Sequence, residues 1–123
     1  MELTPFELRL DRFPSAAKAA RDAVSAWLRR VPCDEDKIDA AVLLVSELVT
    51  NAVIHAASAP LITAAFDDGW LRLEVHDNSA EPPSVRPPGE AGGFGLRVVS
   101  RLSDGWGWTP TEAGKRVWAE VLC

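Results

Sequence analysis

The chain has 123 residues, a length that suits one domain with a real core and is too short for two. Hydrophobic residues make up 47% of it and charged residues 25%, as in globular proteins, and a formal net charge of −5 gives no general attraction to nucleic acid or anionic lipid. Because no apolar run approaches the roughly 20 residues that span a bilayer, and the N-terminus does not have the pattern of a signal peptide, we expect a cytoplasmic protein without membrane contact.

The N-terminal half predicts one strand followed by two helices. Residues 6–10 alternate apolar and polar side chains, which is the period of a half-buried strand. Apolar residues then recur at spacings of three and four between Ser15 and Pro32, which predicts an amphipathic helix. A second helix is expected from about residues 34–36 to residue 57. Its expected core stripe is Ile38, Ala41, Val42, Val45, Val49 and Ala52.

The C-terminal half predicts a hairpin, a long loop, a short helix and two more strands. Residues 61–66 and 70–75 are strand-like runs joined by an Asp-Asp-Gly turn. Residues 77–93 are rich in proline and lack periodicity, which favours a mobile functional loop. A short helix over residues 95–103 and strands at 106–109 and 116–122 follow. This order implies an α+β two-layer sandwich, with a mostly antiparallel sheet and its helices on one face.

A polar stripe lies in the second predicted helix. Glu47, Asn51 and His55 are spaced four residues apart, so they share one helical face. Their neighbours are apolar, so the stripe either faces water or lines a site, and spacing alone leaves these readings about equal. Asparagine and threonine are poor helix formers in mid-helix, which favours a site.

Two further signals flank the long loop. The strand before the loop ends in Asp77, although an Asp-Asn pair at a strand end is usually turn chemistry. After the loop, Gly93, Gly95 and Leu96 open the short helix. Glycine allows a ligand to approach the backbone, and the N–H groups at a helix start can cradle phosphate. A simple helix cap is an equally good interpretation of the glycines.

In their order and spacing these elements together resemble the Bergerat-type ATPase fold of gyrase, histidine kinases and MutL, known as GHKL-type or histidine kinase-like. Within it the chain is most similar to the anti-sigma factor serine kinases and small actinobacterial ATP-binding regulatory proteins. ELVTNAVIHA at residues 47–56 resembles their N-box, VHD at 75–77 their first glycine box, and GFGL at 93–96 their second. GKRVWAE at 114–120 resembles their last strand. The resemblance covers about residues 14–122 and implies that residues 1–123 form a single ATPase domain.

The resemblance also implies a role for each part of a Mg-ATP site. Asn51 would offer its amide oxygen to Mg²⁺, a cation that prefers oxygen ligands. Asp77 would accept a hydrogen bond from the adenine amine, where the carbonyl of guanine would be repelled. The backbone of residues 93–96 would direct N–H groups at the phosphates. Glu47 would be the catalytic residue, which orients or deprotonates the attacking hydroxyl.

The implied function is that of an anti-sigma regulatory serine/threonine kinase. Such a protein binds a sigma factor and phosphorylates a small anti-anti-sigma protein, has no direct contact with nucleic acid, and in this case is a possible homodimer. The alternative is a non-catalytic switch, in which bound ATP gates the binding of a partner. Glu90-Ala91-Gly92 stand where the kinases often carry a basic residue, a departure that affects transfer more than binding. Lys115 or Arg116 replaces a threonine that is common near the adenine.

The two cysteines, Cys33 and Cys123, are too few for the disulfide framework of a small secreted protein. Cytoplasmic thiols are normally kept reduced. We therefore expect both residues to be reduced thiols.

Overall fold

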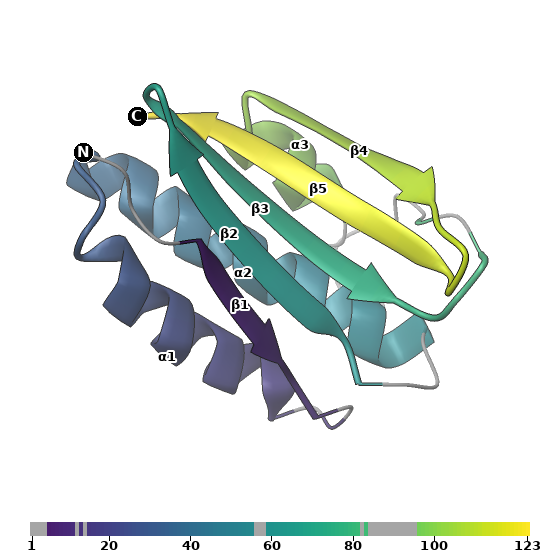
Figure 1. The fold of residues 1–123 in the computed structure, drawn as a ribbon. Coiled ribbons are helices and arrows are strands. Elements are labelled where there is room, and N and C mark those ends of the chain that lie inside the picture. The colour runs from purple at the N-terminus through teal and green to yellow at the C-terminus, as the bar shows by residue number, and fades with distance from the viewer. Residues whose placement is uncertain (1–4, 12, 14, 56–58, 82, 84–95) are drawn as a thin grey trace.

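The computed structural model describes residues 5–11, 13, 15–55, 59–81, 83 and 96–123. The order of elements along the chain is that expected from the sequence (Figure 1). The elements are β1 (Phe6–Arg9), α1 (Ala16–Leu28), α2 (Glu35–His55), β2 (Leu61–Asp67), β3 (Trp70–Asp77), α3 (Leu96–Leu102), β4 (Gly105–Pro110) and β5 (Lys115–Leu122). None of the described helices is long and apolar enough to cross a membrane.

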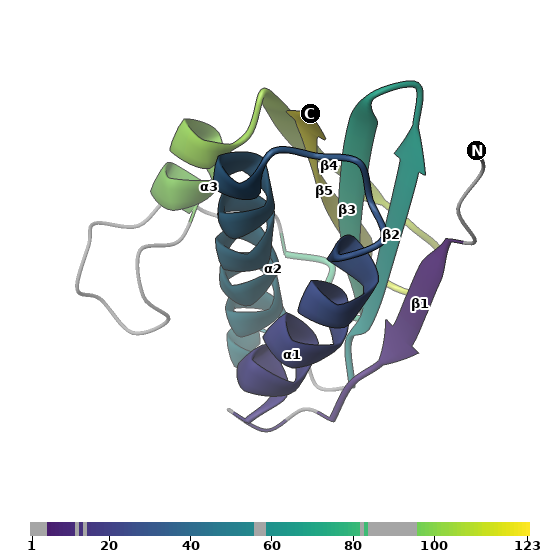
Figure 2. The same ribbon diagram turned by 90° about the vertical axis from the view of Figure 1, so that its left-hand side faces the viewer.

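The five strands form one sheet in the order β1-β2-β3-β5-β4, and every neighbouring pair is antiparallel. Helices α1, α2 and α3 lie together on one face of this sheet, and in the described part of the chain no helix covers the other face (Figure 2). The predicted α+β two-layer sandwich is therefore confirmed. β5, the last strand in the chain, is inserted between β3 and β4. It therefore lies beside β3 at the centre of the sheet, although the two strands are far apart in sequence.

The β2–β3 hairpin forms where the sequence predicts it. Asp68 and Gly69 occupy the turn with positive φ angles of 49° and 83°. Two successive positive φ angles give the tight turn whose twist matches that of the flanking strands, and Asp-Gly adopts them at low cost. The register pairs Asp67 with Trp70 and continues to Leu61 with His76.

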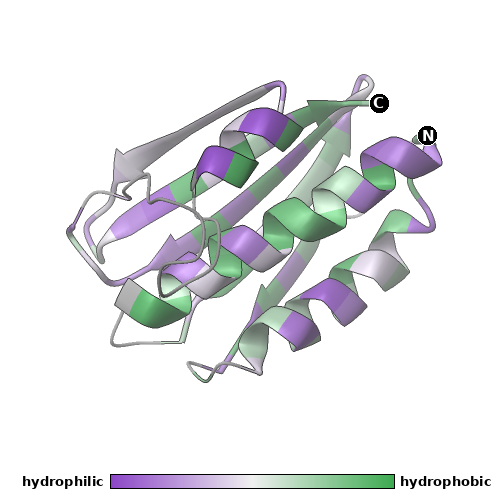
Figure 3. Cartoon of the chain, turned by 180° about the vertical axis from the view of Figure 1, so that it is seen from behind, coloured by the Kyte–Doolittle hydropathy of each residue, from purple (hydrophilic) through white to green (hydrophobic). Residues whose placement is uncertain are grey.

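The core lies between the sheet and the helices. Alternate residues of the central strands, such as Leu71, Leu73 and Val75 of β3, are buried on the helix side. α2 packs against α1, α3, β3 and β5, so it is the element with neighbours on most sides. Seen from the helix side, apolar and polar stretches alternate along α2 (Figure 3). Four residues of the predicted stripe are buried, and the other two pack half-buried against the core; the buried ones are Ala41, Val45, Val49 and Ala52.

Cys33 and Cys123 form a disulfide, with their Cα atoms 4.8 Å apart. The expectation of two reduced thiols is therefore wrong for this structure. The residues are 90 positions apart, and they meet because β5 returns to the end of the molecule where α1 is joined to α2. The bond ties the C-terminal end of the sheet to the helical layer.

We expect reduction of this disulfide to lower the free energy of unfolding by about 2–4 kcal/mol, because the cross-link restricts the unfolded chain. Urea unfolding with and without a thiol-free phosphine reductant measures the difference. The protein carrying both Cys33→Ser and Cys123→Ser is the control. Its midpoint of urea unfolding should match that of the reduced wild type and should not change when the reductant is added. An unchanged wild-type midpoint on reduction would contradict the prediction.

A second prediction concerns the turn between β4 and β5, which lies against the end of β3. A Cβ atom on Gly114 would collide with the backbone of Asp77 and Asn78, whereas one on Gly105 would meet nothing within 4 Å. Gly114→Ala should therefore cost about 1–3 kcal/mol of stability through overpacking. Gly105→Ala, the matched control in the same pair of strands, should leave the midpoint of urea unfolding unchanged or slightly raised. Equal midpoints for the two variants would contradict the close contact.

Candidate functional site

The candidate residues lie on elements that converge at one end of the molecule. The C-terminal end of α2, the end of β3 and the turn between β4 and β5 lie at that end (Figures 1 and 2). Among the described residues, the only buried polar or charged residues are Ser46, Glu47, Asp77 and Lys115. Burying such groups costs free energy unless they are partnered, so each calls for a structural or functional reason.

Glu47 and Asn51 lie one helical turn apart on α2. Glu47 is only 8% exposed, and Asn51 is half-buried. The same helical face carries Leu43 and Ile54, each 44% exposed. The polar pair is thus set in a partly open apolar face rather than on a fully solvated one. The reading of these residues as an ordinary solvated stripe does not fit the burial of Glu47.

Ser46 has a structural partner. Its hydroxyl oxygen accepts a hydrogen bond of 2.8 Å from Nη1 of Arg21 on α1. This bond joins the two helices next to Glu47, so it fixes α2 at the level of the candidate site.

Asp77 ends β3 on the buried face of the sheet. Its Oδ1 accepts hydrogen bonds from the backbone N–H of Ser79, at 2.8 Å, and from Nζ of Lys115, at 3.0 Å. The side chains of Asp77 and Lys115 are 2% and 5% exposed, so this is a buried ion pair. The register of β3 and β5 places the two residues directly opposite each other.

The ion pair settles which residue of the last strand stands near the carboxylate. The sequence does not decide whether Lys115 or Arg116 takes this place, and it predicts that the last strand starts at residue 116. In the structure β5 starts at Lys115, and burial alternates so that Lys115, Val117 and Ala119 face inward. Arg116 points to the other face, where Nε lies 3.8 Å from Oε1 of Glu74. In a strand, residues two apart face the same side, so Lys115 faces the same side as the apolar Val117. This alternation is the sequence signal that identifies Lys115 as the inward-facing residue.

Of the predicted glycine turn at residues 93–96, only Leu96 is among the described residues. Gly93 and Gly95 lie outside the described residues, as does most of the loop over residues 77–93. Leu96 begins α3, so the predicted turn leads directly into this helix. α3 packs against α2 and β4. The helix that follows the glycines therefore lies beside the helix that carries Glu47 and Asn51.

A cavity of about 480 Å³ borders the end of β3. Its lining includes His76, Asp77 and Asn78 at the end of β3, Arg9 at the end of β1 and Thr111 in the turn between β4 and β5. Among the described residues, no group of three or more His, Cys, Asp or Glu side chains could hold a metal ion. A metal at this end of the molecule would therefore need ligands beyond these side chains.

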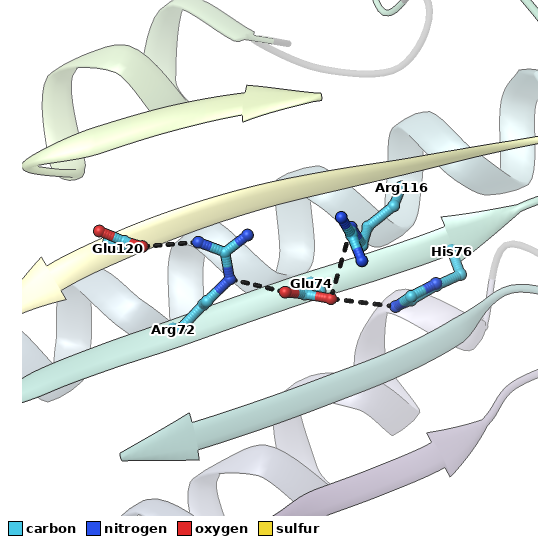
Figure 4. Close-up of polar contacts among 5 residues, drawn as sticks. All are labelled: Arg72, Glu74, His76, Arg116 and Glu120. Carbon is cyan, nitrogen blue, oxygen red and sulfur yellow. Dashed lines mark hydrogen bonds and ion pairs between the residues drawn. The ribbon is translucent and has the colours of Figure 1, made fainter. Parts of the chain in front are cut away.

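A second polar cluster lies on the sheet face that the helices leave open (Figure 4). Arg72 donates hydrogen bonds of 2.6 Å to both Glu74 and Glu120, and its guanidinium lies 4.5 Å from the ring centroid of Trp118. Desolvation lowers the pKa of Arg72, but the bonds to the two carboxylates outweigh it, so the net pKa is raised. Nε2 of His76 is 3.2 Å from Glu74. This cluster ties β3 to β5, and of its residues His76 also lines the cavity at the end of β3.

The sequence model of the histidine kinase-like ATPase domain matches residues 12–121. No curated protein sequence matches the chain. Among solved structures, the chain is similar to the crystal structure of the RsbU and RsbW domains of Rv1364c from Mycobacterium tuberculosis, with a TM-score of 0.78 and 23% sequence identity. The match covers 98% of this chain and 32% of that chain, so this chain spans about a third of its length, and the likeness shows a common fold. Because the family model covers nearly all of the sequence, the chain belongs to the histidine kinase-like ATPase family.

Proposed function

We propose that residues 1–123 act as a single Mg-ATP-binding domain and that the protein is an anti-sigma regulatory serine/threonine kinase. The observation that carries the nucleotide site is the buried carboxylate of Asp77, at the end of β3 beside the N-box helix, in a chain of this ATPase family. Among the described residues, both hydrogen bonds to Asp77 go to Oδ1 and none goes to Oδ2. A carboxylate oxygen is thus left to accept from the adenine amine.

Asn51 fits the role of magnesium ligand in the proposal. Its half-buried amide oxygen is a hard donor, and the described side chains form no metal site by themselves. The phosphate oxygens would supply the remaining coordination, as is usual for Mg²⁺ in nucleotide sites. In the proposal the backbone N–H groups of Gly93, Gly95 and Leu96 cradle the phosphates at the start of α3.

Glu47 is the proposed catalytic residue. It is a buried carboxylate one turn before Asn51, so it would sit close to a phosphate bound through the metal. There it would hold the hydroxyl of a serine or threonine from the partner and accept its proton as the oxygen bonds to the terminal phosphorus, while the bond from that phosphorus to the β–γ bridging oxygen breaks and ADP leaves. Phosphoryl transfer depends mainly on positioning and charge neutralisation, so one carboxylate is enough for this role.

The fold likeness to a structure with an RsbW domain supports the choice of partner class. In the proposal the protein works in the cytoplasm, binds a sigma factor and phosphorylates a small anti-anti-sigma protein. The whole assignment is tested by capture. The immobilised chain with Mg-ATP should retain a sigma factor from a lysate of the source cell, identified by mass spectrometry. If the retained partners include no sigma factor and no phosphorylated small protein, the proposal is wrong.

Substitutions at Glu47 and Asn51 should separate transfer from binding. Glu47→Gln should keep the ATP affinity within a few fold but abolish the phosphoserine or phosphothreonine found on the captured small protein, because the proton acceptor is lost. Asn51→Ala should weaken Mg-dependent ATP binding by about tenfold, the effect of losing one good polar contact. Calorimetry with ATP and Mg²⁺ gives the affinities.

Glu74→Gln is the matched control, since this carboxylate lies on the opposite face of the sheet and should affect neither quantity. Normal phosphate transfer by the Glu47→Gln variant would remove Glu47 from the mechanism. If ATP altered the retention of the partner while even the wild type left no phosphate on it, the ATP-gated switch would be the better account.

A further inference from the structure

The buried ammonium of Lys115 has more hydrogen-bonding capacity than the protein uses. It carries three N–H donors. One bonds Oδ1 of Asp77 at 3.0 Å, and a second makes a long contact of 3.5 Å with the carbonyl oxygen of Ser79. Among the described residues, the third N–H has no acceptor, although the side chain is only 5% exposed. A buried charged donor in this state is costly unless a ligand or water completes it.

The partner of Lys115 complements it. Oδ1 of Asp77 already accepts two hydrogen bonds, and Oδ2 accepts none from the described residues. The ion pair therefore presents one acceptor and one donor on adjacent groups. The edge of an adenine ring presents the reverse pattern, since its 6-amino group donates and the neighbouring ring nitrogen, N1, accepts.

We propose that Lys115 is a second nucleobase-binding residue, whose ammonium donates a hydrogen bond to N1 of adenine while Asp77 accepts one from the 6-amino group. This inference rests on the proposed ATP site. The bond from Lys115 is charge-assisted, which makes it stronger than a bond from a neutral donor. The register of β3 and β5 places Lys115 directly opposite Asp77, so the sheet holds the donor and the acceptor in place and little ordering is needed on binding.

The rival explanation is that the ion pair only holds the β4–β5 hairpin against the end of β3. If that were its only role, loss of Lys115 would lower stability, but the affinity for a nucleotide would not depend on whether its base has an acceptor at N1. The test therefore changes one atom of the ligand. In 1-deaza-ATP, a C–H group replaces N1, while the amine and the triphosphate are unchanged.

Calorimetry should show that the wild type binds 1-deaza-ATP about 10–100-fold more weakly than ATP, the range for a lost hydrogen bond to a charged group. In Lys115→Met, which has no donor to offer N1, ATP affinity should fall and the ratio between the affinities for the two nucleotides should approach one. Arg116→Met is the matched control, because this neighbour on β5 faces the opposite side of the sheet, and it should keep the wild-type ratio.

The outcomes separate this inference from the proposed function. Equal binding of ATP and 1-deaza-ATP by the wild type would overturn the role of Lys115 and leave the ATP site standing. No binding of either nucleotide would overturn the proposed function itself. Tighter binding of GTP than ATP would show that the pair reads the guanine edge and would overturn the adenine contact. If the Lys115→Met variant fails to fold, equal binding of the two nucleotides by the wild type still overturns the role of Lys115.

Discussion

α2 is held on several sides, and the candidate site depends on that constraint. This helix packs against α1, α3, β3 and β5, so its orientation is determined by the core. Its apolar residues fill the space above the sheet, and Glu47 and Asn51 follow on a neighbouring face. Because the helix cannot rotate without exposing Val45 and Val49, the two polar residues hold their positions with the core. Rigid placement of this kind is what positional catalysis and metal binding require.

The Asp77–Lys115 ion pair depends in turn on the sheet. Two buried charges are stable together only when geometry and further hydrogen bonds offset their loss of water. The register of β3 and β5 brings the residues opposite each other, and the backbone of Ser79 adds a hydrogen bond to the carboxylate. The absence of a side chain on Gly114 lets the hairpin turn lie against the same strand end. The packing of these strands and the proposed base contact therefore depend on the same few residues.

Local sequence patterns predicted most of the fold. Strand alternation, helix periodicity and the Asp-Gly turn each depend on residues that are close together in the sequence. Glu47, Asn51 and Asp77 were singled out by their resemblance to the motifs of the family, and their roles stay predictions. The strand order, the disulfide between Cys33 and Cys123 and the partner of Asp77 could not be predicted, since each depends on residues that are distant in sequence. The phosphate cradle at Gly93 and Gly95 stays a prediction.

The order of the strands also has a consequence for the time at which the site forms. Among the described strands, β4 is hydrogen-bonded to β5 alone, and β5 is the strand that joins it to β3. During synthesis, α2 and the β2–β3 hairpin can associate early, but Asp77 then stands at an open sheet edge without its cation. The proposed base contact is complete only when β5, which begins at Lys115, has left the ribosome and inserted between β3 and β4. A nascent chain that has reached the end of α3 therefore carries the N-box but lacks the proposed base site, so under this proposal nucleotide does not stabilise it before the sheet closes.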